Sequence, residues 1–85
     1  MRNLRDLLYS VSISHTVGRT DVSVNEIQFD SRKVNEDDLF VAVRGVTVDG
    51  HNYIEKAIKL GAKVIICEEI PSEIDENISY IKVEN

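Results

Sequence analysis

Two short, continuous apolar runs constrain the fold of this chain more than any other feature. They are LFVAV at residues 39–43 and KVIIC at residues 63–67, and runs of this length are typical of strands covered on both faces of a sheet. Between them lies an amphipathic stretch, residues 51–60, which ends at Gly61 as helices commonly do. Its apolar positions recur at helical spacing and are Tyr53, Ile54, Ala57 and Ile58. The sequence therefore predicts a strand–helix–strand crossover with one parallel strand pair.

The flanking segments extend this unit into a small mixed sheet. Asn3 is placed to cap a short N-terminal helix, whereas residues 14–24 read as a loop. Ile27 and Phe29 alternate with polar residues, as in a half-buried strand, and residues 79–83 alternate in the same way. The expected order is helix, strand, strand, helix, strand, turn, strand, which is an α/β fold class.

Length and charge narrow the domain count and the partners. A chain of 85 residues suffices for one small domain, 1–85. The net charge is −5, and the acidity is concentrated after residue 67. Because no basic stripe is present, we expect no nucleic-acid partner. No segment approaches the roughly 20 apolar residues of a membrane span, so we expect no membrane partner and a cytoplasmic location.

Residues with metal-binding or redox chemistry are few and isolated. Cys67 is the single cysteine, which excludes an internal disulfide, and its apolar run predicts a small buried side chain. The two histidines, His15 and His51, lack neighbouring ligands, so we expect no metal site. The acidic run at residues 36–38 lacks the spacing of a calcium loop and is expected to form a solvated turn.

Two polar segments flank the LFVAV run, and the first is Asp30-Ser31-Arg32. In one interpretation Asp30 makes a side-chain-capped turn and Arg32 pairs with an acid of residues 36–38. In the other, the Ser31 hydroxyl or a neighbouring N–H binds a ligand, because ligands of open α/β sheets collect at the carboxyl ends of strands. The residues alone favour the first interpretation.

The second polar segment, GVTVDGH at residues 45–51, leads from a strand into a helix. Such a loop exposes backbone N–H groups that can hold a phosphate or a carbonyl edge. It does not match the phosphate loop G-x-x-x-x-G-K-[ST], since no lysine follows Gly50, so we expect no nucleoside-triphosphate site here. Asp49 is expected to cap the helix rather than act as an acid, and no nucleophile is placed beside His51.

Taken together, the string DSRKV…DDLFVAVRG…DGHNYIEKAIKLGA, residues 30–62, resembles the N-terminal domain of the Mur ligases. The pattern of that family is D-S-R-x-V-x-x-G-D-L-F-V-A-x-x-G-x-x-x-D-G-H-x-[FY]-I-x-x-A. The family glycine before D-L-F is Asp37 in this chain. Glycine there would suit a positive φ, which Asp tolerates better than most residues but worse than Gly.

The resemblance implies a function in peptidoglycan synthesis, and hence in cell-wall biogenesis, cell shape and cell division. It is closest to the MurE type, an ATP-dependent amide-bond ligase that adds the third peptide residue, diaminopimelate or lysine, to UDP-MurNAc-L-Ala-D-Glu. The MurF type, which adds D-alanyl-D-alanine, is the alternative. These enzymes have a first domain that grips the UDP-sugar, a central ATPase domain using ATP and Mg, and a C-terminal domain. We therefore expect this chain to be the first domain, inactive alone and partnered by its downstream ATPase domain.

The resemblance also implies which residues contact the UDP-N-acetylmuramoyl dipeptide substrate. By position they are Phe29, Ser31, Val46, Thr47 and Val48. Supporting roles in turn geometry and capping are implied for Asp30, Arg32, Gly45, Asp49, Gly50 and His51. No catalytic residue, metal ligand or cofactor contact is implied within these 85 residues.

One further alternative keeps the fold and changes the function. The chain is then a stand-alone protein-interaction module that has lost the ligand. Reading the coding sequence past Asn85 separates the two hypotheses, because a downstream phosphate loop supports the ligase.

Overall fold

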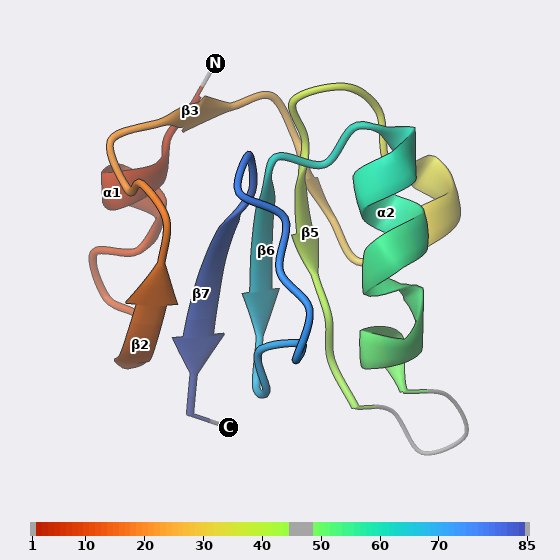
Figure 1. Ribbon diagram of the computed structural model, residues 1–85. Helices are drawn as coiled ribbons and strands as arrows, with labels where there is room; N and C mark the ends of the chain where they lie inside the picture. The colour runs from red at the N-terminus through yellow and green to blue at the C-terminus, as the bar shows by residue number, and fades with distance from the viewer. Residues whose placement is uncertain (1, 45–48, 85) are drawn as a thin grey trace.

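A five-stranded sheet forms the centre of the molecule in the computed structural model, which describes residues 2–44 and 49–84 (Figure 1). The spatial order of the strands is β2-β7-β6-β5-β4. Their bounds are Ile13–Val17 for β2, Ser79–Val83 for β7, Val64–Cys67 for β6, Leu39–Val41 for β5 and Ile27–Gln28 for β4. Strand β2 runs antiparallel to β7, and the other neighbouring pairs are parallel. The expected α/β class, mixed sheet and β5–α2–β6 crossover are confirmed.

Helix α2, Ile54–Leu60, covers one face of this sheet. A 3-10 turn, η2, Gly50–Tyr53, leads into it, and Gly61 ends it with a φ of 118°. Side chains alternate along the strands, so Phe40 and Ile65 face the helix. The cluster on this face comprises Val34, Phe40, Ala42, Ile54, Ala57, Ala62, Ile65, Cys67, Ile78 and Tyr80.

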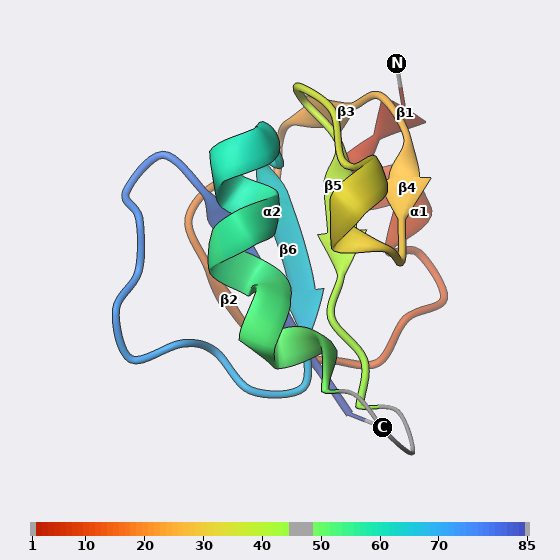
Figure 2. The ribbon, with the colours of Figure 1, turned by 90° about the vertical axis from the view of Figure 1, so that its right-hand side faces the viewer.

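The N-terminal segment covers the opposite face (Figure 2). It contains α1, Leu4–Leu7, and a two-stranded ribbon of β1, Arg2–Asn3, and β3, Ser23–Val24. Asn3 caps α1 as expected, its side chain accepting the Arg5 N–H at 2.9 Å. The buried cluster here comprises Leu4, Leu8, Val24, Leu39, Val64 and Ile81.

The expectation that residues 14–24 form only a loop is wrong, because most of β2 and all of β3 lie there. Strand β2 is an edge strand, and its residues are exposed along almost its whole length. It is held by main-chain pairing with β7, so its sequence, ISHTV, does not need an apolar alternation. Hydrophobic patterning therefore gave no signal for it.

The turn before β5 is built around Asp38, and at this residue the expectation of a solvated acidic turn is wrong, whereas Glu36 is exposed as expected. Asp38 is only 1% exposed. Its carboxylate accepts the N–H of Glu26 at 3.1 Å and of Asn35 at 2.8 Å, and its carbonyl accepts the N–H of Lys63 at 2.9 Å. One residue thus joins the amino ends of β4, β5 and β6.

Asp37, beside it, has a φ of 66° and is the one non-glycine residue with positive φ in the described ranges. The Asp37 N–H donates to the carbonyl of Gly61 at 2.9 Å, which holds the turn against the end of α2. The substitution of the family glycine thus falls where a left-handed conformation is required.

We predict that Asp38→Ala lowers the free energy of unfolding by about 3 kcal/mol, because two backbone N–H donors lose their acceptor. Urea unfolding followed by circular dichroism measures this. The exposed neighbour provides the control, since Glu36→Ala should change the free energy of unfolding by no more than about 0.5 kcal/mol. Equal effects of the two substitutions would contradict the role assigned to Asp38.

We predict that the Asp37→Gly variant is at least as stable as the wild-type chain, and that the Asp37→Ala variant is less stable than the wild-type chain. A left-handed conformation costs L-residues about 1–2 kcal/mol, which glycine avoids. Asp37→Gly and Asp37→Ala both remove the 3.8 Å contact with Lys63, so their difference isolates the backbone effect. Urea midpoints should place the Gly variant above the Ala variant by about 1 kcal/mol in unfolding free energy; the reverse order would contradict this account.

Candidate functional site

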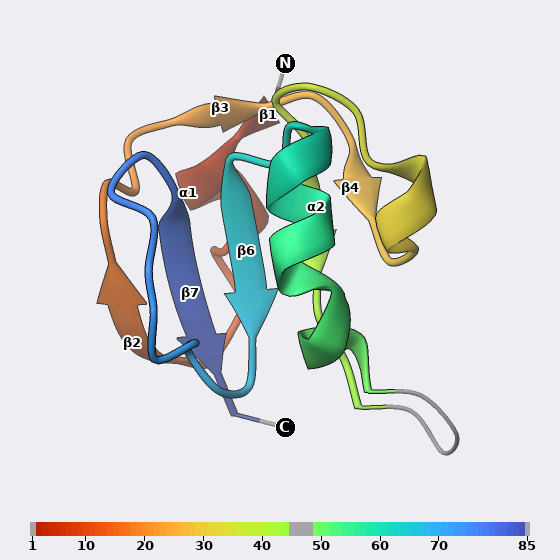
Figure 3. The same ribbon diagram turned by 45° about the vertical axis from the view of Figure 1, so that its right-hand side comes forward.

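A hollow of about 530 Å³ lies between the end of β4 and the start of the α2 helix. Figure 3 shows the two sides of this region, with the 3-10 turn η1, Ser31–Lys33, following β4 and lying beside α2. The lining residues are Phe29, Asp30, Ser31, Arg32, Phe40, Val43, Gly50, Tyr53 and Lys56. Residues from both polar segments that flank LFVAV therefore meet here.

The first wall is the Asp30-Ser31-Arg32 turn. The Asp30 carboxylate accepts the Arg32 N–H at 2.9 Å and so caps η1. It also accepts two bonds from the Arg32 guanidinium, at 3.1 and 2.9 Å, which lowers the pKa of Asp30 to about 2. Arg32 thus pairs with Asp30, and the expected pairing with residues 36–38 is wrong.

Ser31 lies within the same turn and faces the hollow. It is only 6% exposed, yet it belongs to the lining. Among the residues that the structure describes, none is hydrogen-bonded to its hydroxyl. A ligand in the hollow would therefore meet a hydroxyl group with free bonding capacity.

The second wall comes from the two stems of the loop that follows β5. The Gly50 N–H donates to the Val43 carbonyl at 2.7 Å, and Arg44 forms an antiparallel bridge with Asp49. A Cβ at Gly50 would lie 2.8 Å from Val43 backbone atoms, so the close approach of the stems requires glycine.

Gly45, Val46, Thr47 and Val48 lie outside the described residues. Their assignment as ligand contacts, and that of Gly45 as a supporting residue, stays a prediction. The described flanks, Val43 and Gly50, do lie in the hollow with Ser31. This is the arrangement that the prediction requires of the neighbouring chain.

The hollow also contains residues that the sequence did not assign to a site. Tyr53 was expected on the buried stripe of the helix, and this is wrong, because it is 40% exposed and lines the hollow. The helix instead buries Ile54 and Ala57. Lys56 follows Tyr53 at i+3, a spacing that puts both on one side of a helix. Phe29, by contrast, was predicted as a ligand contact and does line the hollow, but it is 68% exposed, whereas the strand pattern predicted a buried side chain.

Asp49 and His51 do not line this hollow. Asp49 caps η2, as expected, by accepting the His51 N–H at 2.9 Å, and this bond with that to the imidazole lowers its pKa. The His51 Nε2 accepts the N–H groups of Glu68 and Glu69 at 3.1 and 3.2 Å. Its Nδ1 lies 2.7 Å from Asp49 and therefore carries the proton of the neutral ring. His51 ties the helix start to the chain after β6.

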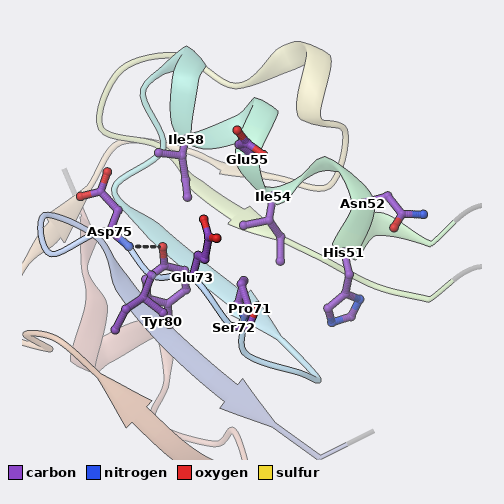
Figure 4. Close-up of a pocket in the computed structure, with 11 residues that line it drawn as sticks. His51, Asn52, Ile54, Glu55, Ile58, Pro71, Ser72, Glu73, Asp75 and Tyr80 are labelled. Carbon is purple, nitrogen blue, oxygen red and sulfur yellow. Dashed lines mark hydrogen bonds between the residues drawn. The ribbon is translucent and has the colours of Figure 1, made fainter.

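A second hollow, of about 660 Å³, lies on the other side of α2, and His51 borders it (Figure 4). Its walls are helix residues and the segment at residues 71–75, above the floor formed by Tyr80, whose hydroxyl accepts the Asp75 N–H at 2.9 Å. Three of its lining residues, Glu55, Glu73 and Asp75, carry carboxylates, and none is a lysine or arginine. This lining repels anionic ligands.

The described residues do not provide a metal-ligand group, a reactive thiol or a membrane-spanning helix. Within residues 2–44 and 49–84, no three His, Cys, Asp or Glu side chains are grouped as metal ligands. Cys67 is buried, and burial raises the pKa of its thiol to about 11, so the thiolate form is scarce at neutral pH. None of the helices in these ranges has the length and apolarity needed to cross a bilayer.

Comparison with known families gives a match to the Mur ligase family, catalytic domain, over residues 23–84. The UDP-N-acetylmuramoyl-L-alanyl-D-glutamate–2,6-diaminopimelate ligase of Cytophaga hutchinsonii is 52% identical over 68 residues, which are 80% of this chain. The ligase of the same name from Parabacteroides distasonis is 45% identical over 82 residues, 96% of the chain. The chain spans only 14% and 17% of the lengths of these relatives.

Solved structures support the same family. MurF from Acinetobacter baumannii superposes with a TM-score of 0.81 at 21% identity, covering 96% of this chain and 18% of that one, which shows the fold. MurF from Thermotoga maritima, in complex with ADP, gives a TM-score of 0.63 at 35% identity over 73% of this chain and 14% of that one. The resemblance inferred from residues 30–62 is confirmed, and the chain belongs to the Mur ligase family, with the fold of its N-terminal domain.

Proposed function

We propose that this domain binds the UDP-N-acetylmuramoyl end of a peptidoglycan precursor, UDP-MurNAc-L-Ala-D-Glu. The observation that carries the proposal is the convergence of the Asp30–Arg32 turn and the Val43 and Gly50 stems on one hollow. In this arrangement the hollow accepts the uridine nucleotide. The remainder of the substrate extends from it toward the parts of the enzyme that carry out the reaction.

The lining suits a nucleotide base in size and chemistry. About 530 Å³ falls within the usual range for small-molecule sites. Phe29 and Tyr53 offer exposed aromatic faces, and base–aromatic stacking contributes about 1–3 kcal/mol per base. The Ser31 hydroxyl and nearby peptide groups offer partners for the polar edges of uracil. The acidic second hollow has no comparable features for an anion.

The addition of the third peptide residue is the reaction best supported. The relatives at 52% and 45% identity are named as ligases that use 2,6-diaminopimelate, whereas the Thermotoga MurF is 35% identical over a smaller share of the chain. We therefore assign the MurE type over the MurF type, with diaminopimelate as the added residue. We also propose a cytoplasmic location, and the single cysteine, the buried Cys67, is consistent with a reducing compartment.

ATP and Mg belong to another part of the proposed enzyme. The 85 residues contain no G-x-x-x-x-G-K-[ST] motif, and the described residues hold no metal-type cluster. The described residues of this chain therefore do not form a site for ATP or for Mg. The proposed role of this domain is substrate recognition, and amide-bond formation requires a downstream ATPase domain.

We predict that titration of the ¹⁵N-labelled chain with UDP shifts the amide signals of Ser31, Gly50 and Tyr53, together with those of Val46, Thr47 and Val48. The second hollow supplies the control, since the amide signals of residues 72–75 should not move. Weak binding is expected because other domains add contacts to the substrate. An absence of shifts at millimolar UDP would count against the proposal and in favour of an interaction module.

We predict that Phe29→Ala weakens UDP binding about fivefold or more through loss of an aromatic contact with the base. The fold should survive, because Phe29 is 68% exposed. Tyr9→Ala is the matched control, because Tyr9 is 92% exposed and lies outside the hollow. Dissociation constants from the same titrations measure both variants, and unchanged affinity in Phe29→Ala would remove Phe29 from the site.

A further inference from the structure

We propose that Lys56 is the residue that recognises the diphosphate of the nucleotide in this hollow. The inference rests on the proposed function, since it assumes that a uridine nucleotide occupies the site. A diphosphate carries negative charge, and its recognition requires an uncompensated positive charge or a set of free N–H donors. Among residues 2–44 and 49–84, three features of the site are candidates for that role: Arg32, the helix start at Gly50, and Lys56.

Arg32 is engaged by its own turn. Its Nε and one terminal nitrogen of its guanidinium bond to both oxygens of Asp30, at 3.1 and 2.9 Å. The bidentate pair cancels the positive charge locally and fixes the direction of the side chain. An anion approaching Arg32 would also approach the Asp30 carboxylate, which lines the same hollow.

The helix start is also engaged. The Gly50 N–H donates to Val43, the His51 N–H to the Asp49 side chain, and the Asn52 N–H to the Asp49 carbonyl, at 2.7, 2.9 and 3.1 Å. The Asp49 carboxylate adds a negative charge at this end. The donors that a helix N-terminus would present to a phosphate are therefore used within the protein.

Lys56 is the remaining candidate for the contact with the diphosphate. It lines the hollow from α2, one turn beyond Tyr53, and its side chain is exposed. Among the described residues, no carboxylate lies within ion-pair distance of its ammonium group. The lining thus carries one negative charge, on Asp30, and two positive charges, on Arg32 and Lys56, and the surplus positive charge is that of Lys56.

The geometry assigns different parts of the ligand to different residues. Tyr53 and Phe29 contact the base, and Lys56, farther along the helix, reaches the phosphates. A long, flexible ammonium side chain suits a point-charge contact with an anion that also has to leave the site. This division predicts that Lys56 discriminates UDP from uridine, while it leaves the affinity for uridine unchanged.

The test compares dissociation constants for uridine and UDP, measured by NMR titration of the 85-residue chain and its variants. Lys56→Gln should weaken UDP binding roughly two- to fivefold, in the range of a solvent-exposed charge contact, and leave uridine binding unchanged. Lys56→Arg should restore UDP affinity. Added NaCl should weaken UDP binding to the wild-type chain and have a smaller effect on Lys56→Gln.

Lys59→Gln is the matched control, because it removes the same charge from the same helix. Lys59 is exposed, lies outside the hollow and is 3.7 Å from Glu55. If Lys59→Gln and Lys56→Gln weaken UDP binding equally, only net charge matters, and the inference is overturned. It is also overturned if Lys56→Gln weakens uridine and UDP alike, or neither. If the wild-type chain binds neither ligand, the proposed function itself fails, which is a distinct result.

Discussion

The buried carboxylate of Asp38 is the interaction on which the arrangement of this domain depends. It accepts backbone N–H groups from Glu26, at the entrance to β4, and from Asn35, in the turn before β5. Strand β4 is short and pairs with β5 over Ile27↔Leu39 and Gln28↔Phe40. So brief a ladder specifies register weakly without a further constraint, and a slip of one residue would move every side chain to the opposite face. Asp38 supplies the constraint at the amino end, and the hollow forms at the carboxyl end of the same strands.

Much of the fold could be predicted because its central elements follow simple periodicities. The apolar runs at residues 39–43 and 63–67 and the amphipathic helix between them appear as β5, β6 and α2. Strand β2 could not be found in this way, since an exposed edge strand is held by main-chain bonds that leave no hydrophobic pattern. The burial of Asp38 was missed for a related reason. A run of acidic residues normally indicates a solvent-exposed turn. The backbone N–H groups of Glu26 and Asn35, which bond the Asp38 carboxylate, are brought to it only by the tertiary fold.

The site was predictable where local turn chemistry determines it. The Asp30 and Asp49 caps follow from residue type and position alone, and the structure has both. Tyr53 and Lys56 were missed because helical spacing alone does not say which side of the helix start packs against the sheet. The observed solution buries Ile54 and Ala57 and leaves Tyr53 to the hollow. The flank of the helix beside its sheet contacts therefore carries the candidate ligand residues.

The two hollows beside α2 show how charge can separate sites of similar size. One is lined by three carboxylates without a lysine or arginine, and the other contains an Asp–Arg pair and one further lysine. In a chain with a net charge of −5, long-range attraction does not draw an anionic nucleotide to the surface. In the proposed site, local contacts provide the affinity instead, through aromatic faces, peptide edges and the ammonium group of Lys56. Under the proposed function, such a site would select a uridine nucleotide with modest affinity, as suits a domain proposed to share its substrate with other domains.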